Sequence, residues 1–274
     1  MMNRFITRGH RTGSAALLLA LLFALRITPC LSSEGSVHIA VASNFAPTLR
    51  LLTASFRLQS PHRLKVSTAS TGKLFAQIRH GAPFELFLSA DAERPELLVA
   101  EGRAVPESLF TYAIGRLALW QPAGAEIASR DSEILGVTIG RLAIANPKTA
   151  PYGKAAEETL RALGLWETWR TRLVRGENIG QTYQFVASGA VDSGFVALSQ
   201  IPARNRRATK NENPGPSTER IRIVPSSLHA SLRQRAVLLY RGANNAKAKE
   251  FLDFLRSREA REIIRAEGYG LPDS

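Results

Sequence analysis

The stretch VHIAVASNFAPTLRLLTASF, residues 37–56, decides the fold. Its first six residues, Val37–Ala42, are almost continuously apolar, which is typical of a parallel strand buried on both faces. After Ser43 the apolar residues recur at helical spacing, at Phe45, Leu49, Leu52 and Phe56. A strand that runs directly into a helix is the repeating unit of α/β folds, so an α/β fold is expected.

The same alternation continues along the chain. Further strands are predicted at 64–67, 84–89, 114–120, 141–145, 174–178, 194–198, 221–224 and 236–240. Helices are predicted around 74–78, 95–101, 154–163 and 180–188, and in a long C-terminal stretch with a buried stripe at Phe251, Leu252, Leu255, Ile263 and Ile264. This order indicates mostly parallel sheets flanked by helices. Two such sets indicate two lobes, 34–112 plus 225–274 and 113–224, with a ligand cleft between them at the carboxyl ends of the strands.

The first 33 residues have the order of an export signal. Arg4, Arg8 and Arg11 precede an apolar run at 15–24, and small residues follow Pro29. The run is too short to cross a membrane, which takes about twenty residues, so residues 1–33 are expected to be a cleaved signal peptide. Arg26 just after the run leaves an uncleaved anchor as the alternative. Cys30, the only cysteine, lies in this segment, so no disulfide is expected in the exported chain.

The charge balance favours an anionic small partner over nucleic acid. The formal net charge is +13, and the first 33 residues account for four of these charges because they hold four arginines and no acid. A positive field speeds the encounter with anions. Aromatic residues are not interleaved with the basic ones, and the densest basic cluster, 203–220, is rich in Pro and Asn. It is predicted to be a solvated, mobile loop that binding does not need.

Four predicted strand-to-helix junctions carry uncharged hydrogen-bond donors. Helix N-termini offer unpaired N–H groups and a favourable dipole, so such places bind anions without a cationic side chain. Taken singly, Ser, Thr or Asn before a helix is more often an ordinary cap of its own helix. Four junctions facing one cleft favour a site for a tetrahedral anion. They are Ser43-Asn44, Ser70-Thr71-Gly72, Pro151-Tyr152-Gly153 and Asn178-Ile179-Gly180.

The sequence does not support a nucleotide-binding loop, a metal site or a transferase active site. Ser-Thr-Gly-Lys at 70–73 resembles the end of a nucleotide-binding loop, but Ser67 stands where that loop needs its first Gly, and Leu74 stands where Ser or Thr would bind magnesium. The histidines are scattered, without metal-ligand spacing. An acyl or phosphoryl transferase would need a base beside its nucleophile, and no junction contains a histidine. No catalytic residue and no cofactor are therefore predicted.

The whole exported part of the sequence resembles the periplasmic molybdate-binding proteins of ABC transporters. The resemblance rests, in order, on AVASNFAPTL, STASTGKLFAQI, GAPFELFLSAD, RLAIANPKTAPYGKAAEETLRALGLW and ENIGQTYQFVASGAVDSGFV. It implies a two-lobed type II periplasmic-binding fold that captures molybdate or tungstate and delivers it to a membrane permease. It also implies a monomer in the periplasm that is not an enzyme.

In that family, hydroxyl and backbone N–H groups hold the oxyanion. Carried over by resemblance, the contacts fall on Ser43, Thr71, Tyr152 through its hydroxyl, and the backbone N–H of Ile179, with Asn44 and Ser70 adjacent. One branch of the family has a ligand-contacting tyrosine where this chain has Ala197, while another branch takes it from the turn that holds Tyr152.

The identity of the anion stays open in part. A site made only of donors suits a fully deprotonated oxyanion, whereas monoprotonated phosphate calls for an acceptor such as a carboxylate, and no junction contains Asp or Glu. Sulfate has the same charge and shape at smaller size. A sulfate or thiosulfate receptor is therefore the closest alternative, and an enzyme on the same fold or an anion-sensing module is a more distant one.

Overall fold

The first sheet is built around the strand-to-helix unit at the start of the described chain. The computed structural model describes residues 36–60, 63–123, 133–135, 137–208 and 219–272, so the predicted signal peptide, 1–33, lies outside the described residues. The strand order is β2-β1-β3-β12-β4. The strands are β1 (Val37–Ala42), β2 (Leu64–Ala69), β3 (Leu86–Leu88), β4 (Phe110–Gly115) and β12 (Leu232–Leu238).

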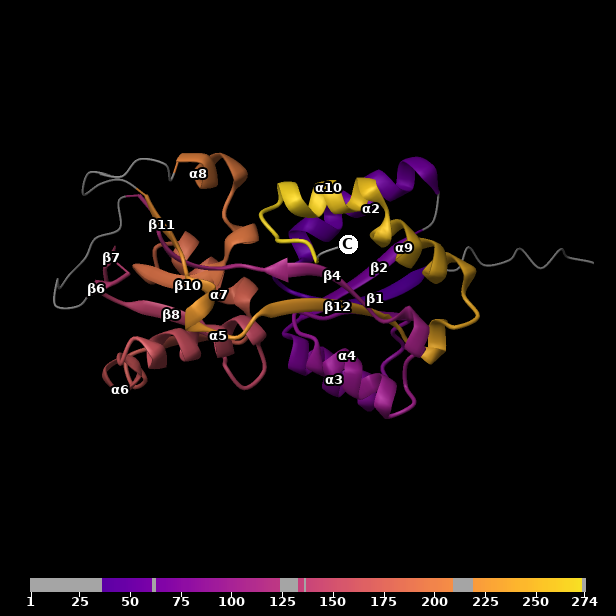
Figure 1. Ribbon diagram of the computed structural model, residues 1–274, viewed down its shortest axis with the longest axis horizontal. Helices are drawn as coiled ribbons and strands as arrows, with labels where there is room; N and C mark the ends of the chain where they lie inside the picture. The colour runs from indigo at the N-terminus through magenta and orange to yellow at the C-terminus, as the bar shows by residue number, and fades with distance from the viewer. Residues whose placement is uncertain (1–35, 61–62, 124–132, 136, 209–218, 273–274) are drawn as a thin grey trace, which may run out of the picture. The chain divides into compact units, whose positions relative to one another are not determined.

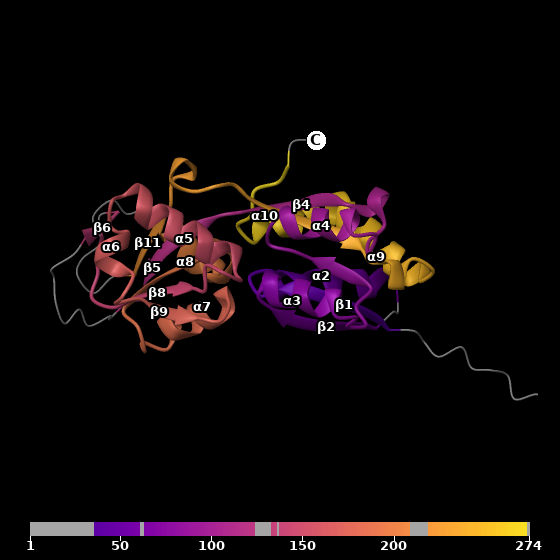
Figure 2. The same ribbon diagram turned by 90° about the horizontal axis from the view of Figure 1, so that it is seen from below.

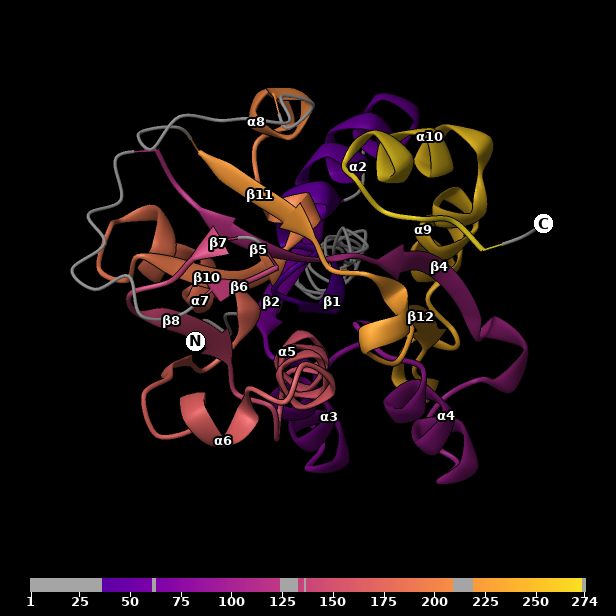
Figure 3. The same cartoon turned by 60° about the vertical axis from the view of Figure 1, so that its left-hand side comes forward.

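Helices cover both faces of this sheet, because its strands alternate apolar side chains toward each face. Phe87 and Val237 contribute to one core, while Leu86 and Leu238 contribute to the opposite one. Figures 1 and 3 show α2, α9 and α10 on one face and α3 and α4 on the other. These helices are α2 (Ala46–Gln59), α3 (Thr71–Arg79), α4 (Glu93–Ala100), α9 (Ala246–Arg256) and α10 (Arg258–Ala266).

The second sheet has the order β11-β5-β10-β8-β9. On one face α5 and α6 pack through residues such as Leu160 and Trp169, and on the other α7 packs through Val186. The strands are β5 (Leu117–Gln121), β8 (Leu142–Ala145), β9 (Val174–Gly176), β10 (Ser193–Ala197) and β11 (Arg220–Ile223). The helices are α5 (Pro151–Ala162), α6 (Trp166–Trp169), α7 (Ile179–Ala187) and α8 (Ala203–Ala208), and the short strands β6 (Glu133–Ile134) and β7 (Val137–Thr138) pair with each other.

Strands that cross between the sheets make both sheets mixed. The prediction of one strand at 114–120 is wrong, because β4 pairs with β12 in the first sheet and β5 pairs with β10 and β11 in the second. Figure 1 shows β4 and β12 running between the two lobes. Each sheet therefore has two parallel and two antiparallel pairings. The predicted boundary between residues 112 and 113 lies inside β4, and the lobe limits stay a proposal.

The predicted C-terminal helix is two helices. The chain breaks at Ser257, whose backbone is extended and whose Oγ accepts a hydrogen bond from the N–H of Ala260, so that it caps the start of α10. Serine is among the preferred residues for this role. Of the five positions predicted for the buried stripe, Phe251, Leu252, Leu255 and Ile264 are buried, whereas Ile263 is only partly buried. No helix among the described residues has both the length and the apolarity to cross a membrane.

The prediction of a mobile loop at 203–220 is wrong for its first and last residues. Residues 203–208 form α8 and Arg220 begins β11, whereas 209–218 lie outside the described residues. Arg206 ties α8 to the rest of the fold, because its guanidinium donates to the carbonyl oxygens of Leu198, Ser199, Ile201 and Ala266. A guanidinium carries five N–H donors in a fixed planar arrangement, which suits such multiple bonding.

We expect Arg206→Met to lower the free energy of unfolding by about 1–3 kcal/mol, since hydrogen bonds to charged groups contribute about that much. Urea denaturation measures the change. Arg204→Met is the matched control, because Arg204 lies on the same helix, is exposed, and bonds only weakly to the neighbouring Asn205 at 3.3 Å. Equal stability of the two variants would contradict a structural role of Arg206.

Candidate functional site

All six predicted site residues line one small cavity. It is lined by Ala42, Ser43, Asn44, Ser70, Thr71, Ala90, Ala150, Pro151, Tyr152 and Ile179. None of these residues, all within the described part of the chain, carries a charged side chain. The space open to the centre of a water-sized sphere is about 10 Å³, roughly the minimum that one water needs. In the described conformation the cavity has no room for a sugar or a peptide.

Ser43 and Asn44 form the tight turn between β1 and α2. Neither caps α2, whose N-cap residue is Phe45 without a side-chain cap bond. Ser43 Oγ accepts a hydrogen bond from the N–H of Gly180 in the other lobe, at 3.2 Å. Asn44 Nδ2 donates to Gln234 Oε1 and to the Tyr269 hydroxyl. The amide donors of Asn44 therefore point away from any ligand, and Asn44 is left to act through its backbone N–H.

The two hydroxyls at the start of α3 differ in their bonding. Ser70 is the N-cap residue but makes no side-chain cap bond, and its buried Oγ has no hydrogen-bond partner among the described residues. Thr71 Oγ1 accepts from the N–H of Ala90 at 3.1 Å. Because an unpaired buried hydroxyl is costly, its place in the cavity wall points to a ligand as its partner. Ser70 is thus the stronger candidate for a direct contact, and Thr71 also holds the cavity wall together.

Tyr152 lines the cavity, and its hydroxyl bonds to Gln234 on β12. Pro151 is the first residue of α5 and Tyr152 the second, so the Tyr152 N–H is among the first-turn groups that have no partner within the helix. The hydroxyl accepts a hydrogen bond from Gln234 Nε2 at 3.0 Å, and Gln234 does not line the cavity. The predicted donation by the hydroxyl stays a prediction, and the structure adds the N–H of Tyr152 as a second donor.

Ile179 is the first residue of α7, where backbone N–H groups have no partner within the helix. Asn178 Oδ1 caps the helix by accepting from the N–H of Gln181, and Ser43 takes the N–H of Gly180. Neither of these acceptors takes the N–H of Ile179. The N-cap role that is common for Ser, Thr and Asn therefore holds for Asn178 but not for Ser43 or Ser70.

Three helices, α3, α5 and α7, begin at the cavity wall. A helix N-terminus carries about half a positive elementary charge, which acts over its first turn. Figure 2 shows α3 of the first lobe and α7 of the second facing each other across the lobes. The cavity is therefore electropositive without a single cation, which favours an anion and costs no desolvation of a buried Lys or Arg.

Contacts between the lobes surround the cavity. Gly72 donates its N–H to the Thr149 carbonyl oxygen at 2.8 Å, and Lys73 pairs with Glu177 at the surface. At Gly180 an added Cβ would lie 3.0 Å from Asn178 Oδ1 and 3.3 Å from Ser43 Cβ. The absence of a side chain at Gly180 is thus what lets α7 approach Ser43.

The sequence matches the family of bacterial extracellular solute-binding proteins over residues 37–270. It is 42% identical to the molybdate-binding protein ModA of Rhodobacter capsulatus over 259 residues, which are 94% of this chain and 96% of the relative. The chain belongs to the bacterial extracellular solute-binding proteins. These curated relatives are named as binding proteins, not enzymes.

Solved structures of solute-binding proteins have the same two-lobed fold. The periplasmic molybdate-binding protein of Azotobacter vinelandii superposes with a TM-score of 0.76 at 35% identity, covering 87% of this chain and all of that one. The sulfate-binding protein SubI of Mycobacterium tuberculosis reaches a TM-score of 0.64 at 11% identity, covering 87% of each chain, which shows the fold alone. The predicted two-lobed α/β fold is confirmed. The prediction that its sheets are mostly parallel is wrong, because half of the strand pairings in each sheet are antiparallel.

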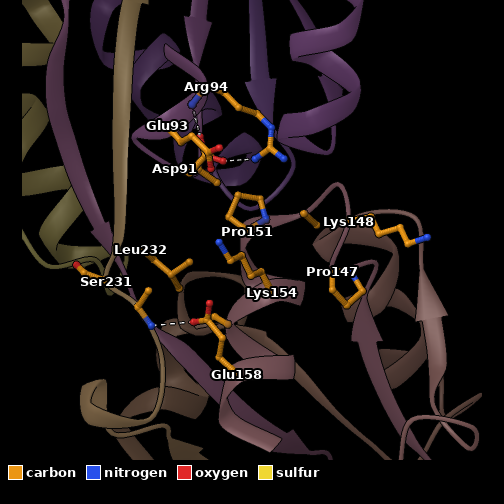
Figure 4. A pocket seen from close by; sticks show the side chains of 14 residues that line it. Asp91, Glu93, Arg94, Pro147, Lys148, Pro151, Lys154, Glu158, Ser231 and Leu232 are labelled. Carbon is orange, nitrogen blue, oxygen red and sulfur yellow. Dashed lines mark hydrogen bonds and ion pairs between the residues drawn. The ribbon is translucent and has the colours of Figure 1, made fainter. Parts of the chain in front are cut away.

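A second pocket of this solute-binding protein, about 280 Å³, adjoins the small cavity and shares Ala90, Ala150 and Pro151 with it. In contrast to the cavity it contains charged side chains. Figure 4 shows Lys154 between Pro151 and Glu158, and Arg94 paired with Asp91. Glu158 accepts from the N–H of Ala230 at 2.8 Å. This charged pocket continues the cleft from the buried wall toward solvent.

Sequence reasoning missed the buried polar groups behind the cavity. Gln234 and Tyr269 bond to Asn44, and Tyr112 bonds to Gln234, yet each comes from a segment distant in the chain. Gln234 stands between Arg233 and Arg235 in β12, so no local pattern marks it as a buried residue.

In this solute-binding protein we expect Ser70→Ala to leave stability nearly unchanged, because the Ser70 hydroxyl has no partner to lose. Its affinity for an oxyanion should fall roughly ten- to hundredfold, since a hydrogen bond to a charged group contributes about 1.5–3 kcal/mol. Thr71→Val should instead lower the free energy of unfolding by about 1–3 kcal/mol, because the N–H of Ala90 loses its acceptor. Denaturation and titration calorimetry separate the two effects, and unchanged affinity of Ser70→Ala would remove Ser70 from the site.

Alkaline pH should destabilise the protein. Burial raises the pKa of Tyr112 and Tyr152 well above 10.0 and that of Tyr269 to about 12. Above about pH 10 the unfolded tyrosines lose protons that the folded ones keep, so the unfolding free energy falls as pH rises toward 12. Urea midpoints between about pH 8 and 11 measure this, and Tyr269→Phe should reduce the slope. The exposed Tyr240, changed to Phe, is the control; an equal reduction there would contradict the assignment.

Proposed function

We propose that the protein binds molybdate or tungstate and delivers it to the permease of an ABC transporter. The observation that carries the proposal is the cavity wall, in which hydroxyls and helix-start N–H groups from four junctions meet without any charged side chain. The names of the relatives, molybdate-binding proteins at 42% and 39% identity, support this ligand. We assign the contacts to Ser43, Asn44, Ser70, Thr71, Tyr152 and Ile179.

The donors in the cavity wall favour anions that carry no proton over anions that carry one. A fully deprotonated tetrahedral anion presents only acceptors, which hydroxyl and N–H donors satisfy. Monoprotonated phosphate would bring a donor, and no carboxylate lines the cavity to receive it. Two buried polar atoms in the wall, Asn44 Oδ1 and the Ser70 hydroxyl oxygen, have no partner among the described residues, and neither belongs to a carboxylate that could take the phosphate proton. Phosphate should therefore bind weakly.

Sulfate differs from molybdate in size rather than in charge, so its exclusion depends on the dimensions of the site. The structural likeness to a sulfate-binding protein at 11% identity concerns the fold and does not favour sulfate. The likeness to molybdate-binding proteins extends over 87–94% of the chain at three to four times that identity. A sulfate or thiosulfate receptor is accordingly not favoured.

The ion would enter through the charged pocket and be enclosed as the lobes close on it. We propose that residues 1–33 direct export and are removed, that the protein works in the periplasm as a monomer, and that the lobes comprise 34–112 plus 225–274 and 113–224. The crossing strands β4 and β12 would then form the hinge. Contacts between lobes, such as Gly180 to Ser43, would form on closure.

Thermal unfolding with molybdate, tungstate, sulfate and phosphate in parallel tests the ligand. A ligand that binds only the native state adds about 4 kcal/mol of stability at a thousandfold excess over Kd. We expect large increases in Tm with molybdate and tungstate, a small one with sulfate and none with phosphate. Equal increases with sulfate and molybdate would contradict the molybdate assignment.

A further inference from the structure

A cluster of buried polar side chains lies between the lobes, behind the cavity. We call it the hinge cluster; its members are Asn44, Tyr112, Tyr152, Gln234 and Tyr269, each at most 4% exposed. Asn44 and Tyr112 come from the first lobe, Tyr152 lies in the first turn of α5 in the second, and Gln234 lies on the crossing strand β12. Two of the members, Asn44 and Tyr152, also line the cavity, whereas the other three do not.

Gln234 is the central member. It is fully buried, and the register of β12 against β4 shifts between Gln234 and Arg235. Its Oε1 accepts from Asn44 Nδ2 at 2.9 Å and from the Tyr112 hydroxyl at 3.1 Å. Its Nε2 donates to the Tyr152 hydroxyl at 3.0 Å. One amide thus connects two residues of the cavity wall that belong to different lobes.

The direction of these bonds sets what the wall residues can do. Because Gln234 donates to Tyr152, the hydroxyl proton of Tyr152 is not used on Gln234 and remains available to another acceptor. Because Gln234 accepts from Asn44, the Asn44 amide is turned so that its donors face the hinge cluster. An amide is the side chain that can accept at one end and donate at the other, so no apolar or purely accepting residue reproduces this arrangement.

The Tyr152 hydroxyl and the Gln234 amide pack closely against Gly115, so the hydrogen bond between them depends on the relative position of the lobes. A Cβ at Gly115 would lie 2.4 Å from the Tyr152 hydroxyl and 2.7 Å from Gln234 Nε2. Both groups therefore sit directly on the crossing strand β4. A shift of α5 away from β4 would break the bond from Gln234 to Tyr152, so this bond belongs to the arrangement in which the site is assembled.

We propose that Gln234 is a positioning residue for the oxyanion site, holding Asn44 of one lobe and Tyr152 of the other in their binding arrangement. The proposal rests on the proposed function. Gln234 does not touch the ligand, and it acts by stabilising the assembled site. Its loss should therefore speed the release of the anion and leave the rate of encounter unchanged, because encounter takes place before the site is assembled.

The test uses Gln234→Met, which keeps an unbranched side chain of similar volume and removes the amide. With molybdate as the ligand, we expect an affinity about tenfold lower, seen as a faster dissociation in stopped-flow tryptophan fluorescence at an unchanged association rate. The matched control is Gln121→Met. Gln121 is also buried at 4% exposure and bonds through its amide to Ser193, but it lies in the second sheet away from the cavity. Its loss should change stability and not affinity.

A double-mutant cycle with Tyr152→Phe separates positioning from general loosening of the fold. If Gln234 acts through Tyr152, each single change lowers affinity about tenfold and the double variant falls at most about threefold further. Gln234→Glu serves if the Met variant does not fold. The protonated carboxyl can both donate and accept, whereas the carboxylate can only accept, so affinity should fall as the pH rises and the buried side chain loses its proton.

The outcomes separate the two proposals. Absence of molybdate binding by the wild type would overturn the proposed function and, with it, the role of Gln234. Binding by the wild type with unchanged affinity of Gln234→Met would overturn the role of Gln234 alone. Effects of Gln234→Met and Tyr152→Phe that multiply to about a hundredfold would show independent action and would likewise contradict positioning through Tyr152.

Discussion

The close approach of Tyr152 and Gln234 to Gly115 is the constraint on which the rest of the site depends. Gly115 lies where the chain leaves the first sheet for the second, and it offers the space in which a hydroxyl from α5 reaches a strand of the other lobe. This contact places the start of α5 next to the starts of α3 and α7. A side chain at Gly115 would displace the Tyr152 hydroxyl and the Gln234 amide, and with them the bond that joins α5 to β12.

The site attracts an anion through helix N-termini rather than through charged side chains. A buried arginine or lysine facing a dianion would carry a large desolvation cost whenever the site is empty. Three helix N-termini supply a positive potential from backbone dipoles that the helices have already aligned, so no charge has to be moved or desolvated. The cations of the chain lie outside, in the charged pocket and on the surface, where Arg94 is paired with Asp91. The net positive charge then speeds the encounter with the anion, and the uncharged donors of the cavity wall determine which anion is bound.

Local patterns predicted the positions of the site residues but not their bonding. Each junction is a local event, a buried strand followed by a helical stripe, and all six predicted residues line one cavity because parallel strands bring their carboxyl ends together. Whether Ser70 or Thr71 has the unused hydroxyl depends on the N–H of Ala90, nineteen residues away. The roles of Gln234 and Arg206 depend on contacts with segments far along the chain, such as Asn44 and Ala266, and no local pattern carries that information. The mixed sheets were missed for the same reason, since an apolar run does not reveal which sheet it joins.

Backbone donors explain how Tyr152 can serve two sites at once. A residue that offers its N–H to a ligand leaves its side chain free, because the position of the N–H is set by the helix and not by the side chain. At Ile179 the free side chain packs in the core of the second lobe. At Tyr152 the ring packs in the same core, and the hydroxyl continues to Gln234 and the crossing strands. Tyr152, the second residue of α5, therefore lies both in the cavity wall and in the hydrogen-bonded cluster around Gln234 on the crossing strand β12.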